Sequence, residues 1–104
     1  MFARFSRLAI GDLRHIANYL INNASVSTAL SVTDHIEATI NETLLDNPRI
    51  GMSINFSGKE MRYFPAKKYD IYNIFYTVED DHIFIVRILH GKRDIASIFR
   101  ENQD

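Results

Sequence analysis

The sequence predicts an α+β domain in which an N-terminal strand and a helical hairpin pack on an antiparallel β-sheet. In the first half, apolar residues recur at spacings of three and four, the period of an amphipathic helix. After residue 51 they form longer runs rich in β-branched and aromatic residues, which is typical of central strands. The 104 residues therefore fit a single domain, 1–104, with the order β-α-α-β-β-β and a short C-terminal helix.

Two amphipathic helices are expected in the first half, close enough to form a hairpin. The first covers about residues 8–22, with an apolar face of Ala9, Leu13, Ile16, Ala17 and Leu20. The second begins at an N-cap supplied by Ser25 or Ser27. Its apolar face consists of Ala29, Val32, Ile36, Ile40 and Leu44. It ends before Pro48, because the residue that precedes a proline is disfavoured in a helix.

One short strand is expected in residues 1–6 and three strands after the helices. The later strands are KEMRYFPA, YDIYNIFYTV and HIFIVRILHG, with a hairpin turn at EDD, and residues 52–60 are expected to be a loop or an irregular strand start. In the second of these strands one face consists of Tyr72, Ile74, Tyr76 and Val78. The other face, with Ile71, Asn73, Phe75 and Thr77, mixes polar and aromatic residues and could receive a partner.

Composition excludes several classes of function. The chain has no cysteine, which excludes disulfides, thiolate metal sites and cysteine catalysis and suits the cytoplasm. A net charge of −1 argues against a strong general binder of nucleic acid. No apolar run is long enough for a membrane helix. The histidines His15, His35 and His82 fall in separate elements, so we expect no metal site, and no cofactor motif is present.

Three segments follow one another in the order and at the spacing of a known family. They are LAIGDLRHIANYL in the first helix, the helix ending with Leu44, Asn47, Pro48 and Gly51, and MRYFPAKKYDIYNIFYTVEDDHIFIVRILHGKRDI. Together they resemble the RelE/ParE superfamily of toxins from type II toxin–antitoxin systems, and the ending RILHGKRDI is similar to the ParE type. The resemblance implies a cytoplasmic bacterial toxin that forms a hetero-oligomer with a cognate antitoxin. It also implies two alternative activities within the superfamily.

A ParE-like toxin poisons DNA gyrase by binding, and we favour no catalytic residue for it. We expect the target to contact Arg87, His90, Lys92 and Arg93. A RelE-like toxin would instead be an endoribonuclease acting on ribosome-bound mRNA, and its candidates here are Glu60, Arg62, Arg87 and His90. The charge of −1 and the absence of a tyrosine after Tyr76 argue against the nuclease. A third alternative is an inactive toxin fold retained for antitoxin binding.

The same residues also have purely structural interpretations. Arg87 can pair with a carboxylate at the sheet edge, and His90 can be an ordinary histidine at a strand end. Asp94 can cap the final helix, while Arg93 can pair with Asp94 or Asp12. For the antitoxin we expect a groove formed by the helical hairpin and an exposed sheet edge, with contacts from Leu13, Ile16, Leu20 and Phe75.

Overall fold

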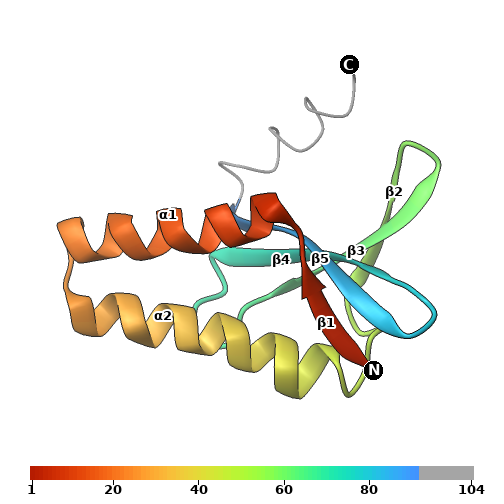
Figure 1. Ribbon diagram of the computed structural model, residues 1–104, viewed down its shortest axis with the longest axis horizontal. Helices are drawn as coiled ribbons and strands as arrows, with labels where there is room; N and C mark the ends of the chain where they lie inside the picture. Colours follow the sequence, from red (N-terminus) through yellow and green to blue (C-terminus); the bar gives the residue numbers. More distant parts are fainter. Residues whose placement is uncertain (92–104) are drawn as a thin grey trace.

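The protein has two layers, with two helices lying on one side of a five-stranded sheet (Figure 1). This computed structural model describes residues 1–91. The predicted C-terminal helix, together with Lys92, Arg93 and Asp94, lies outside the described residues. Within them the elements are, in chain order, β1 (Phe2–Phe5), α1 (Arg7–Asn23), α2 (Val26–Ala38), η1 (Thr39–Leu44), β2 (Met52–Phe56), β3 (Lys59–Pro65), β4 (Tyr72–Val78) and β5 (His82–His90). The predicted order is confirmed, with β2 as an added strand.

The two helices begin where the sequence supplies capping side chains. Ser6 Oγ accepts the backbone N–H of Ala9 at the start of α1, and Ser25 Oγ accepts that of Thr28 at the start of α2. Of the two caps predicted for α2, Ser25 is the one observed. The helix continues through η1 as a π-helical turn, which keeps the apolar face in register as far as Leu44.

The sheet is mixed. Its strand order is β1-β5-β4-β3-β2, with antiparallel pairing from β2 to β5 as predicted and parallel pairing of β1 with β5. The β2–β3 hairpin closes through Ser57 and Gly58, whose φ angles are 54° and 78°. Positive φ at both central residues is the feature of the two-residue turns that match strand twist. This turn converts the expected irregular start into a paired strand.

The main core lies between the helices and the sheet. It contains the inner faces of α1 and α2 together with Tyr72, Ile74 and Tyr76 from β4, with Val78 packed against it. The predicted division of β4 into two faces is therefore confirmed. A second cluster, which we call the outer cluster, consists of Met61, Phe75 and Leu89 on β3, β4 and β5. No helix among the described residues is long and apolar enough to cross a membrane.

Candidate functional site

The first part of the site is the end of β5 that extends beyond its pairing with β1. β1 pairs with β5 only as far as the partners Phe5 and Ile85, while β5 runs on to His90. Beyond that point the turn into α1 takes over the hydrogen bonding. Ser6 donates from its backbone N to Ile85 O at 2.9 Å and from its hydroxyl to Val86 O at 2.7 Å. A single serine thus caps α1 and also binds the β5 backbone.

Six residues after Ser6, Asp12 on α1 continues this edge. Its carboxylate accepts Nε of Arg87 at 2.9 Å and Nη2 of Arg87 at 3.0 Å, a bidentate ion pair. The same carboxylate accepts the backbone N–H of Ile88 at 2.9 Å. Both charged side chains are 13% exposed. The predicted pairing of Arg87 with a carboxylate at the sheet edge is confirmed, and Asp12 is its partner.

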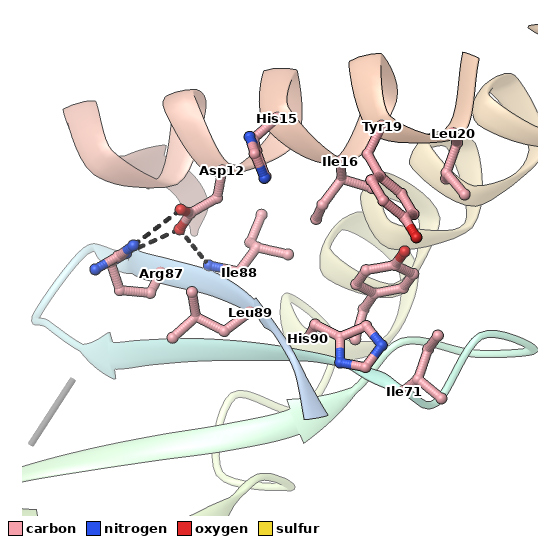
Figure 2. Close-up of a pocket in the computed structure, with 11 residues that line it drawn as sticks. Asp12, His15, Ile16, Tyr19, Leu20, Ile71, Arg87, Ile88, Leu89 and His90 are labelled. Atoms are coloured by element: carbon pink, nitrogen blue, oxygen red, sulfur yellow. Dashed lines mark hydrogen bonds and ion pairs between the residues drawn. The ribbon is translucent and has the colours of Figure 1, made fainter. Parts of the chain in front are cut away.

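A groove opens beyond this ion pair, between α1 and the end of β5 (Figure 2). Its volume is about 640 Å³. α1 supplies one wall, with Asp12, His15, Ile16, Tyr19 and Leu20, and the strand ends supply the other, with Ile71, Tyr72, Arg87, Ile88, Leu89 and His90. The rings of Tyr72 and His90 meet edge to face at 5.7 Å between centroids. We call this the α1–β5 groove. It has a polar ion pair at one end and aromatic rings at the other.

A second polar centre lies on β3. Nη1 of Arg62 donates to the carbonyls of Arg49 and Gly51 at 3.0 and 2.8 Å, and Nη2 lies 3.4 Å from Glu60 Oε1. Nearby, the Tyr76 hydroxyl donates to Pro48 O at 2.7 Å and accepts the Gly51 N–H at 3.0 Å. Burial raises the pKa of the Tyr76 phenol above its ordinary value. Arg62 and Tyr76 therefore hold the loop between η1 and β2.

The structure brings some of the predicted site residues together and separates others. Arg87 and His90 line the α1–β5 groove. Glu60 and Arg62 lie on β3, which is separated from β5 by β4. Two strand spacings put about 10 Å between the backbones of these pairs. Lys92 and Arg93 lie outside the described residues. Among residues 1–91, no group of histidines and carboxylates is arranged to hold a metal ion.

The four residues predicted to contact the antitoxin also lie in different parts of the structure. Ile16 and Leu20 line the α1–β5 groove, while Leu13 lines a smaller hollow on the other flank of α1. That hollow, of about 320 Å³, is formed by Phe5, Ile10, Leu13, Glu37 and Asn41. Phe75 lies in the outer cluster and is 2% exposed. Three of the four residues therefore belong to α1 and line hollows on two sides of the helix, whereas Phe75 lies in the sheet.

Sequence reasoning did not assign the polar wall of the groove. Asp12, His15 and Tyr19 recur at spacings of three and four, so they share one face of α1 beside its apolar face. That spacing was the available signal. Their proximity to β5 could not be read from it, because Asp12 and Arg87 are separated by 75 residues.

Comparisons with known proteins agree with this architecture. The fold is similar to a solved structure described as the chromosomal ParDE TA system from P. aeruginosa, with a TM-score of 0.74 and 18% sequence identity. The match covers 88% of this chain and 97% of the other. At that identity the likeness establishes the fold. A search of the curated proteins finds no match.

The sequence itself assigns the family. Residues 3–95 match the family model of the ParE toxin of the type II toxin–antitoxin system parDE. This match extends from β1 to beyond β5 and includes both walls of the α1–β5 groove. The chain belongs to the ParE toxin family.

Proposed function

We propose that this ParE-family toxin arrests growth by binding DNA gyrase and that a cognate antitoxin neutralises it in the cytoplasm. Family membership supports the toxin and its antitoxin context. The observation that favours binding over RNA cleavage is that both candidate arginines are already engaged by acceptors within the protein. Arg87 is paired through two hydrogen bonds with Asp12, and Arg62 is engaged by Glu60 and two loop carbonyls.

A nuclease of the alternative kind needs its cations and its acid or base around one phosphate. A phosphate at Arg87 would have to replace Asp12, whose negative charge already neutralises the guanidinium and repels an anion. Arg62 would have to leave the loop that it holds, and it lies two strands away. The geometry therefore supports a toxin that acts through contact, with no catalytic residue.

For the target-binding face we propose the end of β5 and the residues that follow it. His90 is half-buried at the mouth of the α1–β5 groove, and Lys92 and Arg93 come directly after Gly91 in the sequence. In this arrangement Arg87 has a positioning role, because its ion pair with Asp12 fixes the end of β5 against α1. His90 and the two basic residues supply the direct contacts.

For the antitoxin we propose a segment that lies along α1. The helix is flanked by the α1–β5 groove and by the smaller hollow at Leu13, and its exposed apolar residues include Ile10 and Tyr19. Beside the groove β1 has already ended, and Ser6 and Asp12 bind the β5 backbone only as far as Ile88, so an extended segment can approach the edge of β5 beyond Ile88. Apolar side chains from such a segment would fill the groove.

Induced expression in cells tests the proposal, with and without the antitoxin gene. We expect growth arrest with DNA breaks and induction of the DNA-damage response, and rescue by the antitoxin. Arrest with cleaved mRNA and intact DNA would contradict gyrase as the target, and harmless expression would indicate an inactive fold. His90→Ala should weaken the arrest. His82→Ala is the matched control, since it changes the same residue type at the opposite end of β5.

A further inference from the structure

β5 contains one residue more than the part of β4 that it faces. Two adjacent residues of β4, Phe75 and Tyr76, pair with Arg87 and Ile85, so Val86 is an extra residue in β5. This is a β-bulge, in which two residues of one strand lie opposite a single residue of its neighbour. On the other edge of β5, pairing with β1 ends at Ile85. The bulge therefore lies where β5 passes from β1 to α1.

The bulge reverses the faces on which the later residues of β5 lie. Ile85 belongs to the main core, and strict alternation from it would put Leu89 on the same side and His90 on the opposite side. The structure shows the reverse arrangement. Ile88 lies in the main core and Leu89 in the outer cluster. His90 pairs with Tyr72 and lines the α1–β5 groove (Figure 2). The extra residue therefore places His90 on the groove side of the sheet.

Ser6 holds the bulge from the side of α1. Its backbone N donates to Ile85 O at 2.9 Å, and its hydroxyl donates to Val86 O at 2.7 Å. In a regular strand two successive carbonyls point to opposite edges, so two that bind one serine mark a bulged backbone. Just beyond the bulge, Asp12 accepts the N–H of Ile88 at 2.9 Å. Ser6 is thus bound to the strand at the bulge itself.

We propose that Ser6 is a positioning residue for target binding, because it fixes the bulge that turns His90 into the α1–β5 groove. This inference rests on the proposed function only in assigning His90 to the target-binding face. The hydroxyl of Ser6 has two roles, since it also caps α1 by accepting the N–H of Ala9 at 2.9 Å. The two roles can be separated, because glycine is an acceptable N-cap residue but has no hydroxyl.

Ser6→Gly tests the proposal with little loss of helix capping. The readout is the nuclear Overhauser effect between the rings of His90 and Tyr72, which meet edge to face at 5.7 Å between centroids. We expect its intensity to fall about twofold or more, and hydrogen exchange at the Ile88 amide to become about tenfold faster. Ser6→Thr keeps a hydroxyl and should retain both wild-type values.

Ser25→Gly is the matched control, because it removes the capping serine of α2, whose hydroxyl bonds within that helix. It should leave the contact between His90 and Tyr72 and the exchange at Ile88 unchanged. An undiminished contact between His90 and Tyr72 in Ser6→Gly would overturn the proposal. An equal loss in Ser25→Gly would also overturn it, because the effect would then follow from helix capping.

Cleavage of supercoiled plasmid by gyrase gives the functional readout. Ser6→Gly should require about tenfold more toxin for half-maximal formation of linear DNA. Adding His90→Ala to Ser6→Gly should cause little further loss, because both changes remove the same contact, and additive losses would contradict the positioning role. No linear DNA with the unaltered toxin would instead contradict gyrase as the target. The contact between His90 and Tyr72 does not involve gyrase, so it decides the role of Ser6 in either case.

Discussion

Asp12 Oδ2 accepts two hydrogen bonds from β5, one from Nε of Arg87 and one from the backbone N of Ile88, each at 2.9 Å. A single carboxylate thus satisfies an arginine and a backbone donor at the point where β1 no longer pairs with β5. It fastens the first helix to the last described strand. Asp12, Arg87 and Ile88 all line the α1–β5 groove, so this connection forms one end of its wall.

Asp12→Ala should therefore destabilise the fold. It leaves a nearly buried guanidinium and a backbone N–H without their acceptor, which costs about 2–4 kcal/mol. For a domain of this size, the expected fall in Tm is about 10 °C or more. Asp12→Asn retains an acceptor for Ile88 and should cost less. Asp34→Ala, an exposed carboxylate on α2, should leave Tm nearly unchanged, and equal effects for Asp12 and Asp34 would contradict the role of Asp12.

The loop before β2 leaves no space for a side chain at Gly51. A Cβ there would lie 2.5 Å from the Tyr76 hydroxyl and 2.9 Å from the backbone oxygen of Tyr63. Tyr76 is fully buried and hydrogen-bonded to this loop, and the second contact is backbone, so neither can yield easily and Gly51→Ala should cost about 1–3 kcal/mol or more. Urea denaturation measures the change. Gly11→Ala, where a Cβ meets nothing within 4 Å, is the matched control and should be neutral or stabilising.

Tyr76 should make stability sensitive to alkaline pH. Burial raises the pKa of its phenol in the folded state above the ordinary value near 10, so the folded state holds this proton longer than the unfolded state. The contribution to stability is complete below the unfolded pKa and is lost as pH rises through the folded pKa. Tyr76→Phe should lower stability at neutral pH but flatten its decline above about pH 10. Parallel pH profiles for the two proteins would contradict this assignment.

Antitoxin binding should depend on the α1 wall of the groove. Tyr19 is 53% exposed and lines the α1–β5 groove, so Tyr19→Ala should weaken the complex by about tenfold or more with little effect on Tm. Isothermal calorimetry with the cognate antitoxin measures this. Leu30→Ala removes an equally exposed apolar side chain from α2, outside both hollows, and should bind normally. If Leu30→Ala weakens binding as much as Tyr19→Ala, the partner lies elsewhere on the hairpin.

The sequence was sufficient to predict those helices and strands in which apolar residues recur on one side with the period of the element. The apolar faces that contain Ile16 and Ile36 predicted both helices within a residue or two at the start, and the two faces of β4 followed from strand alternation. β2 was predicted only as a loop or an irregular strand start, although its five residues, MSINF, alternate apolar and polar side chains as a strand does. Its existence depends on the turn at Ser57 and Gly58.

Relationships across the chain were harder to predict. The parallel pairing of β1 with β5 is not encoded in the four residues of β1, because strand direction is set by the path through α1. The choice of Asp12 as the partner of Arg87 likewise depends on how α1 crosses the end of β5. The candidate residues Glu60 and Arg62 looked compatible with one site in sequence, but β4 lies between them and Arg87.

The most direct test of the account is a reaction of purified DNA gyrase with supercoiled plasmid, ATP and increasing amounts of toxin, stopped with detergent and protease. A toxin that poisons gyrase by binding should produce linear DNA in proportion to its concentration, and prior addition of antitoxin should suppress it. Two results together would contradict gyrase poisoning and assign the end of β5 to catalysis. The first is an unchanged plasmid with normal supercoiling. The second is cleavage of ribosome-bound mRNA that Arg87→Ala abolishes while Tm is retained.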